Sequence, residues 1–347
     1  MKYPFLLMIT IAILFAGCSK KEEKPLTNKN QFATDTSEIK TIPVSNPNES
    51  FSLKYTFEKG KKYQYRISSI SSDIETMKTD STRNQNFKQN SVYILELSPL
   101  ETDQEGTIEI SAVISSIKIE AWMDGKKITY ESGTVMDSTE KLKYSQYEAL
   151  VKNPFNIRIS KIGEILEIMR VDKIVSRFIE LNVKASAMNS EQKSALRMNF
   201  IDGLLRPLFV QIFRPIPDHS IAKDSTWSIA QRPTEAMVFK LESRNIYKIS
   251  NLEKLGNDKI AIIDGSIMTV ISGDNKAVNK GVSYDFTKPV ITASGKIYFN
   301  ITKGAIMKSK VNTKTNMHFT MEAPSPKGTQ RGERWGTTEN IYIAELL

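Results

Sequence analysis

The sequence contains few of the residues that build disulfides, metal sites and catalytic centres. Its 347 residues include one cysteine, Cys18, and two histidines, His219 and His318. A single cysteine excludes an intrachain disulfide and a metal site with several cysteine ligands. The two histidines are far apart in the sequence, and neither belongs to a His-Glu-x-x-His motif. A glycine-rich phosphate loop is also absent, so the sequence predicts neither a metal nor a cofactor.

Long apolar runs are absent as well, except for one at the start of the chain. Residues Phe5 to Phe15 are almost all apolar, Lys2 precedes them, and the small residues Ala16 and Gly17 follow. Because a transmembrane helix needs about 20 apolar residues, this run is too short to span a membrane. Residues 1–17 are therefore predicted to be an export signal peptide.

Cys18 directly follows this signal. The four residues from Phe15 to Cys18 resemble the lipobox of bacterial lipoproteins, whose cysteine is acylated before the signal is removed. The resemblance implies that Cys18 carries a lipid that anchors the protein in a membrane of the cell envelope, where each buried methylene contributes about 0.8 kcal/mol. The alternative is a cysteine buried in a hydrophobic core.

Residues 18–50 are predicted to be a lipidated cysteine followed by a disordered tether. They are rich in Lys, Glu, Asn, Thr, Ser and Pro, so they cannot bury enough apolar surface to become ordered. Ser19 to Glu23 resembles the acidic export signal that sends some lipoproteins to the outer face of the outer membrane. A surface-exposed outer-membrane protein is one interpretation of this stretch, and a charged linker is the other.

The formal net charge is +9. Because the protein is predicted to be exported, nucleic acid is not expected as its partner. The basic residues either form a solvated surface or attract acidic lipids or polysaccharides of the envelope.

Alternating apolar and polar residues predict strands through most of residues 51–347, a single β-rich body. Phe51 to Phe57 and Tyr63 to Ile67 are expected to pair as a hairpin with one apolar face. The longest alternating run extends from Met307 to Met321, and residues 323–334 are expected to form a mobile loop. Further predicted strands are Val92–Leu97, Thr107–Ala121, Phe155–Ser160, Glu164–Met169, Gly295–Gly304 and Asn340–Leu346.

Helical spacing of apolar residues appears near residues 171–213. One stripe contains Ile174, Phe178 and Leu181. Pro207 is expected to kink or end the second helix. The second stripe consists of Leu196, Phe200, Leu204, Leu208 and Ile212, with Ile201, Leu205 and Phe209 beside it. The sequence therefore predicts a mainly β (α+β) fold, a large curved antiparallel sheet or open barrel with two or three central helices packed on one face. The body is either one unit or two similar halves around these helices.

The order of several segments resembles a known family. The resemblance rests on Leu53–Gly60 with Tyr63 and Tyr65, on Phe155–Ser160 with Gly163, on Pro217 followed by Asp224-Ser225-Thr226-Trp227, and on Gly295–Gly304. It covers residues 51 to 347 and is to the bacterial envelope family called domain of unknown function 6263. Lys223 stands where glycine is expected before Asp224. The resemblance implies a fold but no reaction, so no catalytic residue is transferred.

Short motifs for catalysis are weak. Asp218-His219-Ser220 has the residue types of a triad, but adjacent side chains point apart. Ser190-Glu191-Gln192-Lys193 matches a Ser-x-x-Lys pattern without its companion motifs, which favours a helix cap at Ser190.

Two functions are consistent with the sequence. The first is a noncatalytic binding module for a hydrophobic ligand or an envelope protein, based on the apolar run from Met307 to Met321 and the helix from Leu196 to Ile212. The second is a cell-envelope hydrolase whose site is assembled from distant residues. The missing catalytic motifs favour the binding module.

Overall fold

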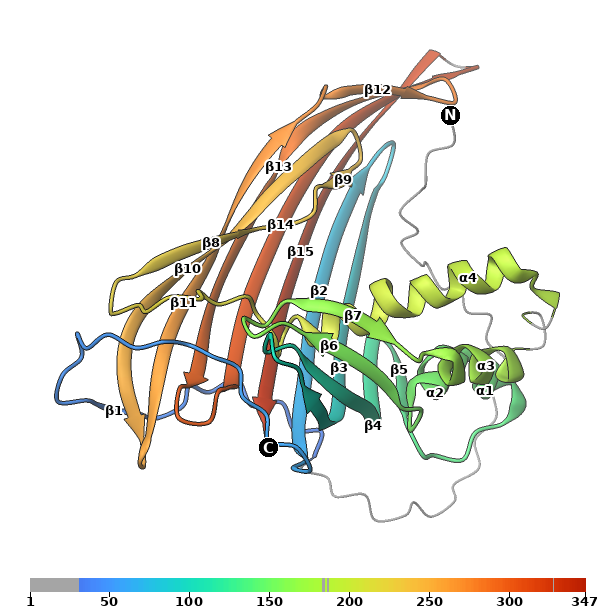
Figure 1. Ribbon diagram of the computed structural model, residues 1–347. Coiled ribbons are helices and arrows are strands. Elements are labelled where there is room, and N and C mark those ends of the chain that lie inside the picture. Colours follow the sequence, from blue (N-terminus) through green and yellow to red (C-terminus); the bar gives the residue numbers. More distant parts are fainter. Residues whose placement is uncertain (1–30, 183–184, 186, 327) are drawn as a thin grey trace.

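A computed structural model of the protein describes residues 31–182, 185, 187–326 and 328–347 (Figure 1). Its main feature is one 15-stranded antiparallel sheet, which confirms the predicted mainly β class and the large antiparallel sheet. The strands are β1 (Ile42–Pro43), β2 (Tyr63–Lys78), β3 (Thr82–Thr102), β4 (Ile108–Met123), β5 (Lys126–Glu131), β6 (Phe155–Ile159), β7 (Ile165–Met169), β8 (Thr226–Ala230), β9 (Thr234–Ala236), β10 (Phe239–Leu255), β11 (Asp258–Ser272), β12 (Lys276–Asn279), β13 (Val282–Asn300), β14 (Ala305–Ser325) and β15 (Gly328–Leu346).

The sheet is curved and open (Figure 1). Its strands follow the order β1-β10-β11-β13-β14-β15-β2-β3-β4-β6-β7, with β8 and β9 on β10, β12 on β13 and β5 on β4. Because β1 and β7 end this path without pairing to each other, the sheet does not close into a barrel.

Paired residues of neighbouring strands share a face, so the register assigns every side chain to one of two faces. We call the face that carries Tyr65, Leu95 and Phe299 the core face, and the face that carries Arg66, Trp122 and Lys308 the open face.

The long strand β14 has the predicted alternation. Ser309 to Met321 place every second side chain on the core face, opposite Ala344 to Gly332 of β15. Met307 does not follow this rule, because the β13–β14 register shifts between Tyr298 and Phe299. The predicted loop at 323–334 is wrong: β14 continues to Ser325 and β15 begins at Gly328, so these residues extend a hairpin.

A large hydrophobic core covers the part of the core face around Tyr65, Leu95 and Phe299. It contains side chains of the strands together with a segment before β2, where Leu53, Tyr55 and Phe57 are buried. The predicted hairpin between this segment and β2 is wrong, because β2 pairs with β3 and β15. The segment is extended and inserts its apolar side chains into the core, with the Thr56 amide donating to the Gly304 carbonyl.

The helices lie between β5 and β8 in the sequence. They are α1 (Ser138–Lys143), α2 (Ser145–Leu150), α3 (Asp172–Leu181), α4 (Ser190–Met198), the π-helix η2 (Asn199–Leu205) and α5 (Arg206–Phe209). Phe200, Leu205 and Phe209 join the same buried cluster as Tyr65 and Phe299 of the core face. None of the helices within the described residues is long and apolar enough to cross a membrane.

The π-helix changes which side of the second helical segment is buried. Leu205 and Phe209, which the sequence places beside the stripe, are fully buried, whereas Leu204 and Leu208 in the middle of the stripe are only partly buried. Phe200 and Ile212 of the stripe are buried as predicted. A π-helix adds a residue to the turn and so rotates everything that follows. Pro207 lies in α5 directly after η2, and the helix continues past it to Phe209, so it does not end at this proline.

The core face carries a second apolar cluster toward the end of the sheet where β14 turns into β15. Phe239, Leu241, Phe286 and Phe319 form it, and the Phe286 and Phe319 ring centroids are 5.2 Å apart. Polar residues of β14 and β15, such as Thr313, Thr315, Thr338 and Asn340, lie along the strands between this cluster and the main core. We call Phe239, Leu241, Phe286 and Phe319 the distal cluster.

Residues 32–43, which we call the strap, cross the open face. Phe32 lies near Lys118 of β4, Asp35 binds Lys308 of β14, and Ile42–Pro43 (β1) pair with β10 at the sheet edge. Glu38 also binds Lys296 of β13, so several contacts hold the described part of the expected tether against the sheet. The predicted signal peptide and Cys18 lie outside the described residues.

Candidate functional site

The triad-like residues do not form a triad. His219 Nδ1 lies 3.4 Å from Asp218 Oδ1, and both side chains are exposed. The Ser220 hydroxyl donates instead to the Phe51 carbonyl. A catalytic triad requires this hydroxyl to bind the histidine, so the arrangement is a polar loop, as the sequence indicates.

The Ser-x-x-Lys pattern is part of a helix start. The N-cap of α4 is Asn189, whose side chain accepts from the Gln192 amide at 2.9 Å, while the Gln192 side chain accepts from the Asn189 amide at 2.9 Å. The predicted cap at Ser190 is therefore one residue too late. The turn at Lys223 also differs from the expectation, because the residue with positive φ is Asp224, at 67°.

His318 is held on the open face. Its Nε2 lies 2.8 Å from Glu333 Oε1, its Nδ1 lies 2.9 Å from Thr287 Oγ1, and its ring stacks on Trp335. Both ring nitrogens thus have partners. Within the described ranges, no group of three or more His, Cys, Asp or Glu residues is arranged to hold a metal ion.

The buried tyrosines act as hydrogen-bond donors in the core. Burial raises the pKa of Tyr55 and of Tyr65, whose hydroxyls donate to the carbonyls of Arg214 and Ile306. Burial, together with a 2.6 Å hydrogen bond to Glu148, also raises the pKa of Tyr130. These phenols stay protonated near neutral pH, which suits a structural role and not that of a base.

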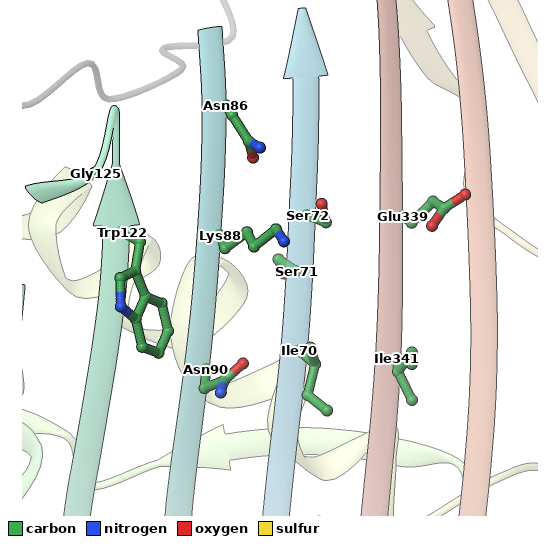
Figure 2. A pocket seen from close by; sticks show the side chains of 10 residues that line it. All are labelled: Ile70, Ser71, Ser72, Asn86, Lys88, Asn90, Trp122, Gly125, Glu339 and Ile341. Atoms are coloured by element: carbon green, nitrogen blue, oxygen red, sulfur yellow. The ribbon is translucent and has the colours of Figure 1, made fainter. Parts of the chain in front are cut away.

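A groove of about 700 Å³ crosses β4, β3, β2 and β15 on the open face (Figure 2). The side chains that point into it from this face are both apolar and polar. They are Ile70, Ser72, Asn86, Lys88, Asn90, Trp122, Glu339 and Ile341.

The strand register arranges these residues in two rows across the sheet. One row joins Trp122, Lys88, Ser72 and Glu339, which are successive cross-strand partners. The neighbouring row joins Asn90, Ile70 and Ile341. Because adjacent strands are about 4.8 Å apart, a row of four residues extends over about 14 Å, long enough for a ligand of several rings or residues.

Most charged groups around the groove have a partner. Glu120 binds Lys127 at 2.8 Å, and Glu339 binds Lys314 at 2.8 Å. The Lys127 ammonium also lies 5.2 Å from the Trp122 ring centroid.

Three consecutive side chains of β3 on this face differ from that pattern. Among the described residues, Asn86, Lys88 and Asn90 find no side-chain hydrogen bond or ion pair, although all three line the groove. Figure 2 shows Trp122 between β4 and β3, and the Lys88 side chain extending from β3 toward β2. A partly exposed aromatic ring, an aliphatic floor and a few polar groups without partners are typical of a ligand site.

A second groove of about 720 Å³ lies at the end of the sheet where β2 turns into β3 and β14 turns into β15. Arg331 binds Glu322 at 2.9 Å and Glu333 binds His318, while Lys78 and Lys276 have no ion pair among the described residues. Its aromatic residue, Tyr284, stacks on Phe286 of the distal cluster. The groove at Trp122 is the stronger candidate, because within the described residues the Trp122 ring stacks on no other aromatic ring and three polar side chains beside it lack partners.

The residues of this groove are not predicted from the sequence. The strand prediction began at Val92, but β3 begins at Thr82. The available signal was the polar repeat at Asn86, Lys88 and Asn90 followed by the lone Trp122. Such a repeat also occurs on solvated strands, so the groove appears only once the strand pairing is known.

Comparison with known proteins identifies a family. The sequence model of the family of unknown function DUF6263 matches residues 105–306, more than half of the chain. The chain belongs to DUF6263. This match covers part of the region on which the resemblance was based and includes β4 with Trp122. No curated protein matches this DUF6263 chain.

Solved structures show distant likenesses to this DUF6263 protein. A lipovitellin structure, described for its lipid–protein interactions, is 11% identical with a TM-score of 0.43, covering 84% of this chain and 25% of that one. An outer membrane channel from Pseudomonas putida F1 is 6% identical with a TM-score of 0.19, covering 84% and 97%. A DUF1329 family protein from Desulfovibrio piger ATCC 29098 is 8% identical with a TM-score of 0.12, covering 79% and 83%.

The DUF6263 chain spans about a quarter of the length of the lipovitellin chain. These TM-scores are too low to indicate a shared fold. None of the three likenesses therefore bears on function.

Proposed function

We propose that this protein is a lipid-anchored, noncatalytic binding module of the cell envelope that holds its ligand in the groove at Trp122. The observation that carries the proposal is the set of unpartnered side chains, Asn86, Lys88 and Asn90, around a half-exposed tryptophan. Polar side chains that have no partner in the protein keep hydrogen-bond donors and acceptors that a ligand in the groove can use.

The structure changes where a ligand is expected. The sequence pointed to the apolar face between β14 and the second helical segment, but this space is filled by the protein. Phe209, Phe213 and Phe299 are at most 1% exposed there. The groove on the open face has an apolar row, Ile70 and Ile341, next to a polar row, so it suits an amphipathic ligand.

Ligand capture tests this function. The full chain, purified in a nonionic detergent, is incubated with separated lipid, glycan and peptide fractions of an envelope extract, and bound molecules are identified by native mass spectrometry. We expect one fraction to bind wild type and to lose most of its binding to Trp122→Ala. Trp335→Ala is the matched control, since Trp335 is an exposed tryptophan elsewhere on the same face. Equal binding by both variants, or no bound molecule, would refute the proposal.

The lipid anchor is a separate part of the proposal. Cys18 directly follows the signal-like segment, and acylation there would attach the body to a membrane. Labelling cells with an alkyne fatty acid is expected to mark wild type but not Cys18→Ser. Membrane fractionation of the same cells is expected to place the labelled protein in the outer membrane. Equal labelling of both proteins contradicts the anchor.

A further inference from the structure

We infer that the groove at Trp122 binds an acidic saccharide chain, with a sugar ring on the Trp122 indole, sugar hydroxyls on Asn86 and Asn90, and the acidic group on Lys88. This inference rests on the proposed function and specifies the ligand class of the same site. Four features of the groove carry it.

The first feature is the indole of Trp122. It is half-buried on β4 and lies beside the side chains of β3 that line the groove (Figure 2). The face of a pyranose ring is made of C–H groups, which pack on a flat aromatic ring, while its hydroxyls point outward to polar neighbours. A groove with one partly exposed aromatic ring and polar side chains around it meets both needs.

The second feature is the pair of amides, Asn86 and Asn90. Each amide offers two donors and an acceptor oxygen, and neither side chain has a partner within the described residues. Two neighbouring sugar hydroxyls present a donor and an acceptor side by side, which an amide can match. An acyl chain over these amides would leave them unsatisfied, at a cost of about 1–3 kcal/mol for each buried group. The polar row therefore favours a saccharide over a lipid tail.

The third feature is the position of these amides along β3. Asn86, Lys88 and Asn90 are two residues apart and share a face, so the outer two are about 13 Å apart. This distance exceeds the size of one sugar ring. The groove therefore suits a chain of sugars and not a monosaccharide.

The fourth feature is the charge of Lys88. The carboxylates of Glu120 and Glu339 already bind Lys127 and Lys314, so no carboxylate in the described part of the groove neutralises the Lys88 ammonium. A carboxylate or sulfate on the ligand would fill this position with a charge-assisted hydrogen bond. Removal of residues 1–17 takes away only Lys2, so the net charge falls from +9 to +8 and still attracts a polyanion from a distance.

The test compares two ligands that differ only in charge. The full chain in nonionic detergent is titrated by calorimetry with an oligogalacturonate and with the carboxyl-reduced, neutral form of the same oligosaccharide. We expect wild type to bind the acidic form about tenfold more tightly, which corresponds to about 1.4 kcal/mol for one charged contact.

Variants assign the contacts. Lys88→Met is expected to remove the preference for the acidic form and to keep binding of the neutral form. Trp122→Ala is expected to weaken both. Trp335→Ala, which changes an exposed residue elsewhere on the same face, is expected to bind like wild type. The thermal unfolding midpoint of each variant shows that it is folded.

The outcomes separate this inference from the proposed function. If neither oligosaccharide binds while lipid vesicles or peptides bind in a Trp122-dependent manner, the saccharide inference is wrong and the binding module stands. If Lys88→Met keeps the preference for the acidic form, the role of Lys88 is wrong. If no class of molecule binds in a Trp122-dependent manner, both the inference and the proposed function fail.

Discussion

At the scale of single residues, Lys308 is unusual because its charged side chain is only 6% exposed. Its ammonium lies 2.8 Å from Asp35 Oδ2 and 2.9 Å from Glu345 Oε1, and Glu345 also accepts from Arg66 at 2.8 Å. A buried charge is tolerated only when it is paired, and removing one partner leaves the other uncompensated.

We therefore predict that Lys308→Met lowers the free energy of unfolding by about 3 kcal/mol, at the low end for a broken buried pair because Arg66 still neutralises Glu345. Lys314→Met removes an exposed pair with Glu339 and is expected to cost less than about 1 kcal/mol. Urea unfolding of both variants measures the difference. Equal losses would mean that the strap network contributes no more than a surface pair.

Asp35 gives this network a pH dependence. A hydrogen bond from Lys308, with smaller contributions from Ser37, lowers the pKa of Asp35 below its usual value of 3.8. A carboxyl whose pKa is lower in the folded state stabilises that state above the unfolded pKa. This contribution is lost as the pH falls through 3.8 toward the folded pKa.

We predict that wild type loses more stability than Asp35→Asn between about pH 6 and about pH 3, because the asparagine does not titrate. Urea unfolding at the two pH values gives the comparison. Parallel losses in the two proteins would show that Asp35 is not a source of the acid sensitivity.

At the scale of elements, the second helical segment has its buried side set by a π-turn. The repeat from Leu196 to Ile212 assumes 3.6 residues per turn, but η2 inserts a wider turn before α5. As a result Phe209 packs edge-on against Phe155, with ring centroids 5.7 Å apart, while Leu208 remains partly exposed.

We predict that Phe209→Ala lowers the free energy of unfolding by about 3–5 kcal/mol, since it opens a cavity in the core. Leu208→Ala, in the stripe that the sequence favours, is expected to cost less than half as much, because Leu208 is not fully buried. Thermal or urea unfolding distinguishes the two. A larger loss of unfolding free energy for Leu208→Ala would show that the Leu208 side of the helix is the buried one and would contradict the rotation by the π-turn.

Strand alternation predicted the elements that have one buried face. Ser309 to Met321 and Ile108 to Ala121 lie in strands whose alternate side chains are mostly the more buried ones, and this burial produces the pattern. The first part of β3 and residues 323–334 are polar on both faces, so they resemble loops even though they are paired. Their pairing depends on neighbouring strands, which local sequence does not reveal.

The groove was even less predictable. Trp122, Lys88 and Ile341 come from three strands that are distant in the sequence, and only the register brings them into rows. The pairing of residues 51–57 was predicted wrongly for the same reason. Their alternation correctly identified buried side chains, but it does not specify which strand lies beside them.

At the scale of the whole molecule, the core face holds two apolar clusters that do not merge. The distal cluster contains few fully buried residues, and polar residues of β14 and β15 separate it from the main core. Regions with few buried apolar contacts open at a lower free energy than the rest of a fold.

We predict that Phe319→Ala accelerates hydrogen exchange in the far halves of β13, β14 and β15 and leaves β4 and β6 unchanged. Phe319 belongs to the distal cluster, whereas β4 and β6 contribute to the main core. Peptide-resolved exchange measured by mass spectrometry tests this separation. Uniform acceleration across the sheet would show that the two clusters unfold as one cooperative unit.

The strap also limits the distance over which the groove can act. The path from Cys18 to Phe32 contains 14 residue steps, and a fully extended chain spans at most about 3.6 Å per residue, or about 50 Å. If the chain first met the body at Phe51, the same limit would be about 120 Å. Phe32 lies near Lys118, four residues along β4 from Trp122, which is about 13 Å. With Cys18 in the lipid, as proposed, these two distances limit how far the groove can lie from the membrane surface. The groove therefore binds only ligands that come within that distance of the membrane.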